Sequence, residues 1–521
     1  MKVAKNFGNF HFKLYSCVIT SKSKKKEMFI TTENILLIGS LLLFISLIAG
    51  KTSSRFGVPV LVLFLTIGML AGSEGFGGIY FNNPKTAQFI GIIALNFILF
   101  SGGFDTDFKS IKPVLGHGLL LSTLGVLLTT TVLGVFVWYI TDFTIYEGLL
   151  LGSIVSSTDS AAVFSILRSK GLALKHKIRP MLELESGSND SMAYVLTIVF
   201  TSLIVQPETT LLSAIPVLLK QFIIGGALGF IFGRLGTYFI NNIKLDYEGL
   251  YIVLGIAIMF FSFSATDFVG GNGFLAVYIC GIYIGNQELI HKKKYIKSFD
   301  SFAWLMQIIL FVTLGLLVFP SQIFPIIGIG LVISFFLILV ARPLSIFLSL
   351  LPFKMQFRDK IFISWVGLRG GVPIVFATYP LIAGAEKANM IFNIVFFISL
   401  TSILLQGTTL SFIAKKLKLT LPSELKKRTQ TDLELQDSIK SIFKEIEIPK
   451  KCSIVGKQIF ELKFPKTALI SIIKRENSFI TPNGSTVLEA GDKLFIISEN
   501  TNDIQKVFEC LDIPNPEEAT A

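Results

Sequence analysis

The chain has 521 residues, 52% of them hydrophobic, and a formal net charge of +12 at pH 7. Its mean hydropathy of +0.68 reflects far more apolar surface than one soluble core of ordinary size would need. This composition excludes an ordinary soluble protein and predicts a polytopic membrane protein. The four cysteines are too few and too widely spaced for a disulfide framework or a metal-ligand motif.

Apolar windows of about 20 residues, the length of helix that crosses a bilayer, recur along most of the sequence. They begin near thirteen positions: Asn34, Gly57, Thr86, Pro113, Tyr146, Glu185, Leu211, Gly249, Gly271, Ser301, Gln322, Lys360 and Met390. The predicted fold class is therefore an all-α polytopic membrane protein with about 13 transmembrane helices in residues 28–418, joined to a small α+β domain.

Basic residues in the short loops predict the orientation, because Lys and Arg are retained on the cytoplasmic side of a membrane. The loops on one side hold only Lys85, Lys220 and Lys387. The loops on the other side hold Lys51, Arg55, Lys109, Lys112, Arg168, Lys170, Lys175, Lys177, Arg179, Lys244, Lys292, Lys293, Lys294, Lys297, Lys354, Arg358 and Lys360. The second side and the C-terminal tail are assigned to the cytoplasm, which puts the N-terminus on the periplasmic or external side.

The segment 1–27 conflicts with that orientation, because it contains seven lysines and a single acid, Glu27. Translation from Met28 would remove the conflict and lower the formal net charge from +12 to +6. We therefore treat 1–27 as a doubtful basic extension. The alternative is a basic cytoplasmic or targeting extension combined with twelve or fourteen spans.

The composition becomes polar and charged after Lys418. Residues 419–445 are predicted to form a linker, residues 446–513 a small cytoplasmic α+β domain, and residues 514–521 a terminal tail. Within this domain, short apolar runs at 468–473 and 494–497 are typical of strands.

Two predicted spans are interrupted by residues that suit irregular backbone. These are Ser156-Ser157-Thr158-Asp159-Ser160 in the fifth span and Gly367-Leu368-Arg369-Gly370-Gly371-Val372-Pro373 in the twelfth. Non-helical backbone inside a membrane lines a cavity or lies buried in protein. Because the twelfth span comes seven positions after the fifth, an odd offset, the two have opposite orientations. The order predicts inverted repeats with two broken, crossing helices and an ion site near the midplane.

Asp190 is the first candidate for that ion site. It ends the motif Glu185-Ser186-Gly187-Ser188-Asn189-Asp190 in an otherwise apolar segment. An aspartate at the centre of a membrane helix costs roughly 2.5 to 3.5 kcal/mol, so it persists mostly where it pairs, faces water or handles ions. The alternative is that the motif is the solvated start of a helix.

Oxygen ligands for a monovalent cation can be assembled around Asp190. Ser186 lies four residues earlier and shares its helix face. If the fifth span unwinds, the Asp159 carboxylate and freed backbone carbonyls at Thr158 complete the shell. Burial disfavours a bare carboxylate, so Asp190 is expected to hold either a cation or a proton. Because the neighbouring Asn189 is neutral, the simplest exchange is one cation for one proton.

Arg369 lies in an apolar span and needs a negative partner, for which Glu185 and Glu183 are the candidates. We assign this pair a structural role; the alternative places Arg369 in a water-filled funnel near the cytoplasm. Arg342 is expected to face the bundle, but nothing in the sequence identifies its partner. Asp105 is assigned to a short cytoplasmic loop rather than to the site.

The motifs at 157–159, 185–190 and 367–374, in this order, resemble the NhaP branch of monovalent cation:proton antiporters over residues 28–418. Residues 152–165 and 370–380 look most like the bacterial potassium/proton antiporters.

The resemblance implies a homodimer with a dimerisation domain and a six-helix core that carries the ion like an elevator. It also implies that Asp190, Asp159, Ser186 and the Thr158 carbonyl bind the cation. By the same resemblance, Glu185 and Arg369 form a core ion pair and Asn189 is typical of electroneutral members. Ser101 departs from the family, because an acidic residue is expected there in many relatives.

The C-terminal domain is similar to TrkA-C domains, the ligand-sensing half of modules that regulate potassium conductance. Val455-Gly456-Lys457, residues 472–475 and Gly491-Asp492 carry the likeness. No Gly-rich dinucleotide-binding fingerprint precedes them. The resemblance implies a regulatory domain with an unknown small ligand; the alternative is a structural dimerisation lobe.

We therefore expect a secondary antiporter of the inner membrane, not an enzyme and without a cofactor, that exchanges potassium or sodium for protons. Its expected partners are membrane lipid, a second copy of the chain and a small ligand of the C-terminal domain, and not nucleic acid. One alternative is a ligand-gated cation channel, which the lack of a Thr-x-Gly-Tyr-Gly-like filter disfavours. The other is a membrane receptor that senses ions or pH and moves nothing.

Overall fold

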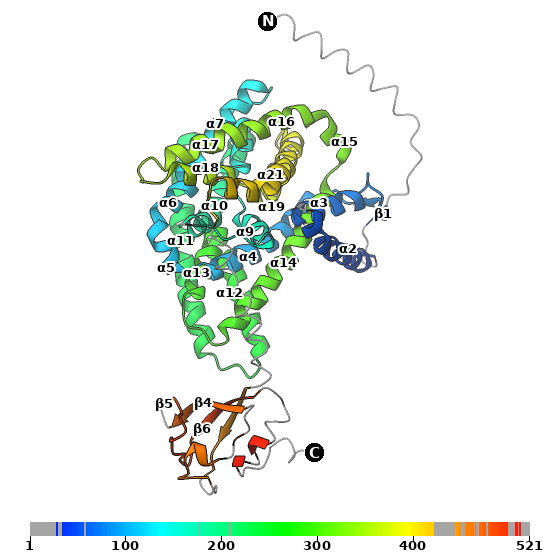
Figure 1. The fold of residues 1–521 in the computed structure, drawn as a ribbon. Helices are drawn as coiled ribbons and strands as arrows, with labels where there is room; N and C mark the ends of the chain where they lie inside the picture. The colour runs from blue at the N-terminus through cyan, green and yellow to red at the C-terminus, as the bar shows by residue number, and fades with distance from the viewer. Residues whose placement is uncertain are drawn as a thin grey trace, which may run out of the picture. The chain divides into compact units, whose positions relative to one another are not determined.

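The computed structural model describes residues 28–511 with gaps at 30–33, 57–58, 176, 207, 209, 421–442, 450–453, 463, 465–467, 476–477, 499–505 and 509. The doubtful extension, most of the predicted linker and the tail 514–521 lie outside the described residues. The chain divides into two compact units, Met1–Leu421 and Pro422–Ala521, and Figure 1 shows that the first is helical and the second contains a sheet.

Helices dominate the first unit. They are α2 (Ile35–Phe56), α3 (Val60–Ala71), α4 (Pro84–Asp105), α5 (Phe108–Ile111), α6 (Leu115–Leu120), α7 (Val126–Ile140), α8 (Ile145–Ile154), α9 (Ser160–Ser169), α10 (Ile178–Val205), α11 (Leu211–Asn242), α12 (Glu248–Phe268), α13 (Gly273–Gly285), α14 (Lys292–Leu317), α15 (Pro320–Ile323), α16 (Ile327–Phe336), α17 (Arg342–Ser349), α18 (Phe357–Trp365), α19 (Gly371–Phe376), α20 (Thr378–Ala383) and α21 (Ala388–Lys416). Two short parallel strands, β1 (Met28–Phe29) and β2 (Ile79–Tyr80), also pair in this unit.

Among the described residues, eight helices are long and apolar enough to cross a membrane, and five shorter apolar helices accompany them. This confirms the predicted polytopic α-helical fold class, while the number of thirteen spans stays a prediction. The eight differ in burial: 72% of the apolar window of α10 is buried, against 11% for the window of the span Ala214–Asn242 within α11. The helix that carries Asp190 is thus the most enclosed of the eight.

Polar residues at the helix starts explain several boundaries. Asn83 caps α4 by accepting a hydrogen bond from the Thr86 amide, 3.0 Å away. Thr144 and Glu147 form a reciprocal capping box at the start of α8. Asn272 accepts from the Leu275 amide at the start of α13. Such side chains satisfy amide groups that have no partner within the helix, which matters most where water is scarce.

The helices of the first unit pack as two groups. In one, which we call the scaffold group, α4 packs closely on α13 and α14, α11 on α13, and α3 on α14 and α2. In the other, the crossing group, α8 packs on α7 and α10, and α21 packs on α16, α19 and α9. Helices α4 and α10 are among those that also make contacts between the groups.

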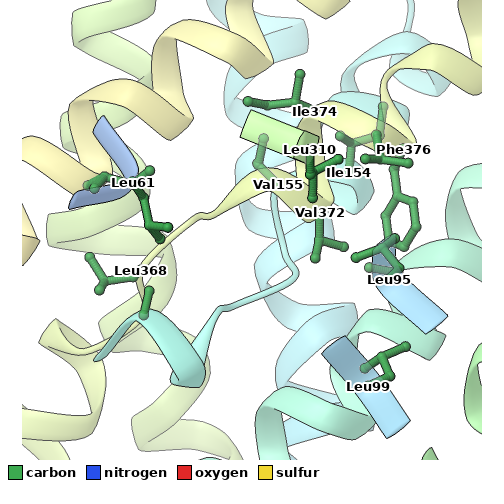
Figure 2. Close-up of a cluster of buried hydrophobic side chains, with 14 of the residues drawn as sticks. Leu61, Leu95, Leu99, Ile154, Val155, Leu310, Leu368, Val372, Ile374 and Phe376 are labelled. Carbon is green, nitrogen blue, oxygen red and sulfur yellow. The ribbon is translucent and has the colours of Figure 1, made fainter. Parts of the chain in front are cut away.

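Two predicted spans are broken, as the sequence indicated. Residues 155–159 separate α8 from α9, and residues 366–370 separate α18 from α19. The two non-helical segments meet where the Asp159 amide donates to the Leu368 carbonyl at 2.8 Å. In Figure 2 Val155 and Leu368 mark these segments, and the buried side chains of Leu310, Val372 and Phe376 lie nearby. The crossing is therefore enclosed in apolar packing.

The second unit contains an antiparallel four-stranded sheet in the order β3-β6-β4-β5. The strands are β3 (Phe443–Glu447), β4 (Ala468–Arg475), β5 (Ser478–Ile480) and β6 (Lys493–Ser498). Strands β4 and β6 confirm the two strands predicted from apolar runs, whereas β3 begins inside the predicted linker. Alternate residues of β6, among them Leu494 and Ile496, are buried in the core of this unit.

An ion pair closes the turn before β6. Asp492 is 1% exposed, accepts two hydrogen bonds of 2.8 Å from the Arg475 guanidinium, and accepts a third from the Glu489 amide. Burial by itself raises the pKa of the Asp492 carboxyl, but the hydrogen bonds from Arg475 and the Glu489 amide outweigh it, and the net pKa is lowered. The ionised form therefore stabilises the folded unit above the ordinary carboxyl pKa, and this contribution is lost as the pH falls through the lowered pKa.

We expect Asp492→Asn to weaken this unit, because hydrogen bonds to a charged group contribute about 1.5–3 kcal/mol. Hydrogen–deuterium exchange on the full chain at neutral pH should show β4 and β6 amides exchanging roughly ten- to a hundredfold faster. Glu447→Gln, which removes an exposed partner of Lys493, is the matched control and should change exchange little. Equal exchange in both variants would contradict a stabilising role for Asp492.

Candidate functional site

The predicted site residues on α10 come together with the break between α8 and α9. Asp190 is 6% exposed, and its carboxylate accepts a hydrogen bond from the Ser157 hydroxyl. The Ser186 hydroxyl donates to the Thr158 carbonyl at 2.8 Å and accepts from the Ser160 amide at 3.0 Å. One face of α10 therefore satisfies the polar backbone that the break exposes.

Asn189 and Asp159 complete this junction. The Asn189 side-chain amide donates to the Thr158 hydroxyl at 2.6 Å, and its oxygen has no hydrogen-bond donor among the described residues. Asp159 caps α9 by accepting from the Ala162 amide at 2.9 Å. A methyl group on Gly370 would come within 2.3 Å of the Asp159 Oδ2 atom. Glycine at 370 therefore lets the second broken helix approach this carboxylate closely.

A cavity of about 140 Å³ reaches the two carboxylates. Asp159, Ser186 and Asp190 line it together with residues of α4, α13 and α14 from the scaffold group. Tyr278 of α13 lies against α10 at Gly187, where a side chain would collide with the tyrosine ring. The Tyr278 hydroxyl donates to the Glu183 carbonyl at 3.2 Å. The site is thus bounded by both helix groups.

Charged residues line the rest of the same cavity. Asp105, which the sequence placed in a loop, ends α4 and lines the cavity. Glu183 and Arg179 line it as well and form an ion pair with a 2.8 Å separation. Arg168 at the end of α9 is the second cationic lining residue. Several charges of both signs therefore accompany the two deeper carboxylates.

Glu185 and Arg369 are both buried, at 1% exposure each, but the ion pair joins Glu185 to a different residue. Arg342 Nη2 lies 2.6 Å from Glu185 Oε1. Among the described residues, no ion pair between Glu185 and Arg369 is formed. The predicted Glu185–Arg369 pair is therefore wrong. The partner of Glu185 is Arg342 of α17, the arginine for which the sequence identified no partner.

Arg369 instead compensates backbone dipoles. Its guanidinium donates to the carbonyls of Ser157, at 3.1 Å, and Ser156, at 3.4 Å, and its amide donates to the Ser402 hydroxyl at 3.0 Å. These carbonyls lie just past the C-terminal end of α8, where a helix carries partial negative charge. The Arg369 guanidinium therefore supplies the hydrogen bonds that these carbonyls lose where the helix is broken.

Sequence reasoning did not assign Ser157 a role, although it belongs to the interrupted segment. Its hydroxyl is the group that contacts the Asp190 carboxylate directly. Only the packing of the break against α10 brings residues 33 positions apart into hydrogen-bond contact. The sequence did offer one signal for this contact, because a cluster of polar residues interrupts the fifth predicted span and Asp190 is a second polar group in an apolar segment.

Comparison with known proteins identifies similar sequences. The sequence matches the family described as "Sodium/hydrogen exchanger, transmembrane" over residues 40–416 and the TrkA-C domain over residues 443–509. It is 44% identical over 390 residues to the K(+)/H(+) antiporter NhaP of Alkalimonas amylolytica, covering 75% of this chain and 68% of that protein. It is 38% identical over 466 residues to the K(+)/H(+) antiporter NhaP2 of Shewanella sp. (strain ANA-3), covering 89% and 81%.

A solved structure is also similar. The sodium proton antiporter MjNhaP1 from Methanocaldococcus jannaschii aligns with a TM-score of 0.65 and 25% sequence identity. The alignment covers 74% of this chain and 99% of that chain.

Removing one partner of the Glu185–Arg342 pair should be more harmful than removing both, because a lone buried charge remains uncompensated at a cost of about 3–5 kcal/mol. We expect Arg342→Gln to lower the midpoint of thermal unfolding of the purified protein, and the double variant E185Q/R342Q to recover part of the loss. Arg179→Gln, which breaks an exposed pair, is the control. If Arg342→Gln and Arg179→Gln unfold at the same temperature, the buried pair does not stabilise the fold.

Proposed function

The chain belongs to the sodium/hydrogen exchanger family and is a monovalent cation:proton antiporter, and from this premise we propose that Asp190 is the group for which cation and proton compete. The observation that supports this role is the burial of its carboxylate at the meeting point of α10, the broken helix and the cavity. Asp190 has a hydroxyl partner in Ser157, and no basic side chain pairs with it among the described residues.

A dehydrated alkali cation needs several oxygen ligands. The carboxylates of Asp190 and Asp159, the Ser186 hydroxyl and the Thr158 carbonyl supply them in one place. Arg369 holds the neighbouring carbonyls of Ser156 and Ser157 and thereby fixes the shape of the break. We assign Glu185, Arg369 and Asn189 to support of the site and not to direct binding.

Competition at one carboxylate couples the two ion flows. An ionised, unoccupied Asp190 carries a full charge, whose transfer through apolar surroundings is costly. Protonation or cation binding neutralises that charge. If the site changes its exposure from one side of the membrane to the other only when neutralised, each cation that moves one way is exchanged for a proton that moves the other way. With Asn189 neutral, the exchange is one for one and electroneutral.

Potassium is the favoured cation, because the similar proteins of Alkalimonas and Shewanella are named K(+)/H(+) antiporters. Sodium is the alternative, since the similar archaeal structure is of a sodium proton antiporter. We assign the C-terminal unit to the cytoplasm and the protein to the inner membrane, and the surplus of basic residues in one set of loops supports this orientation. We further assign the chain a homodimeric state, and the TrkA-C domain a small regulatory ligand.

Replacement of Asp190 tests the proposed competition. In proteoliposomes with the voltage clamped, external potassium should change the luminal pH for the wild type, and Asp190→Asn should reduce the rate at least a hundredfold. Asp246→Asn, a change in an exposed loop, should leave the rate unchanged. Repeating the assay with sodium identifies the preferred cation. Undiminished exchange by folded Asp190→Asn protein would remove Asp190 from the mechanism.

A second acid beside Asp190 tests the stoichiometry. We expect the wild-type exchange rate to be insensitive to membrane potential, because one positive charge crosses in each direction. Asn189→Asp adds a titratable group in contact with the Thr158 hydroxyl, so its exchange should become voltage-dependent. Rates of the two proteins are compared at zero and at about −100 mV, where each net charge contributes about 2.3 kcal/mol. A voltage-dependent wild type would rule out one-for-one exchange.

A further inference from the structure

We propose that a second cavity, separate from the ion site, binds the acyl chain and phosphate of one anionic phospholipid. This cavity has a volume of about 400 Å³ and lies between α2, α3 and α14 of the scaffold group and α9 and α21 of the crossing group. None of the described residues that line it is acidic, whereas the ion-site cavity contains Asp105, Asp159, Glu183 and Asp190. The two cavities therefore suit ligands of opposite charge.

The length of the cavity matches the thickness of one leaflet of a bilayer. Its lining runs along α21 from Ile403 to Ser411, which at about 1.5 Å per residue spans about 12 Å. One leaflet contributes about half of the roughly 30 Å hydrocarbon core. Lys170, an exposed residue next to the end of α9, and Ser46 of α2 both line this cavity. The cavity thus combines the length of one leaflet with a basic side chain and a hydroxyl that suit the polar end of a lipid.

An unsatisfied group inside the cavity also indicates a ligand. Ser46 is 0% exposed, and its hydroxyl has no hydrogen-bond partner among the described residues. A buried hydroxyl without a partner is costly, and an ester carbonyl of a phospholipid is a suitable acceptor for it. Apolar residues, among them Leu61 and Phe64 of α3 and Ile308 of α14, line much of the same cavity. Such a wall suits an acyl chain better than water.

Lys170 selects the headgroup. No ion pair engages its ammonium within the described part of the chain, and a basic residue near a membrane surface contributes about 1 kcal/mol toward an anionic lipid. A bound lipid would contact both helix groups at once, because α2 and α14 form one wall and α9 and α21 the other. Gln307 and α9 also line the ion-site cavity, so the lipid would border the transport site.

Trp304 lines the cavity and serves as the reporter. The variant W138F/W365F retains Trp304 as the single tryptophan of the chain, and its cation/proton exchange is checked first. In phosphatidylcholine nanodiscs, phosphatidylglycerol with brominated acyl chains should quench Trp304 at a lower mole fraction than brominated phosphatidylcholine does. Inorganic phosphate should not reverse the quenching, because phosphate lacks the acyl chain. Equal quenching by the two lipids would overturn the proposal.

Matched variants locate the site. Lys170→Gln should raise the mole fraction of phosphatidylglycerol for half-quenching about fivefold, which corresponds to about 1 kcal/mol. Lys112→Gln, on the same predicted membrane face but outside this cavity, should not. Gly50→Leu adds a side chain to the cavity wall and should remove the quenching; undiminished quenching would show contact with bulk lipid only and overturn the proposal.

If W138F/W365F proves inactive, lipid binding is tested instead by native mass spectrometry of the chain with all three tryptophans. One phosphatidylglycerol per chain should be retained by the wild type and by Lys112→Gln, and lost from Lys170→Gln. Retention of phosphatidylglycerol by Lys170→Gln at the wild-type level would overturn the proposed site.

Discussion

The site depends on one constraint: two helices are broken inside an apolar bundle, and the polar backbone that they expose must be satisfied by protein groups. The structure meets this demand with a small set of side chains. Arg369 holds the carbonyls at the end of α8, Ser186 bonds both Thr158 and Ser160, and the Asp159 amide reaches the Leu368 carbonyl. Ser186 and Asp159 also line the same cavity as Asp190.

The same constraint explains why so many polar residues of the bundle are concentrated at the crossing. Thr158, Ser186 and Asn189 would each be costly in a continuous membrane helix without a partner. Here they are partners of one another, so the cost of the break is offset locally. Among the described side chains, only the Ser157 hydroxyl donates a hydrogen bond to the Asp190 carboxylate. A carboxylate with such incomplete compensation can take up a proton or a cation.

Charge is distributed around the crossing in distinct ways. The Glu185–Arg342 pair is internally neutral and links α10 to α17. Arg369 donates to carbonyls just past the C-terminal end of α8, where a helix carries partial negative charge. The two cavities beside α9 differ in the same respect, because one carries several carboxylates and the other none among its described residues. Helix α9 and Gln307 therefore separate a region suited to cations from one suited to an anionic amphiphile.

The sequence by itself determined the membrane class, the two interrupted spans, the C-terminal strands and the grouping of polar residues that includes Asp159, Ser186 and Asp190. It did so because hydropathy over about 20 residues and breaks in that pattern are local properties. The tertiary structure alone decided which arginine pairs with Glu185, that Ser157 contacts Asp190, and that Asp105 lines the cavity and not only a loop. These contacts join residues of different helices, and which residues meet depends on how the helices pack. The sequence predicted Arg369 as the partner of Glu185, whereas the packing brings Arg342 to it.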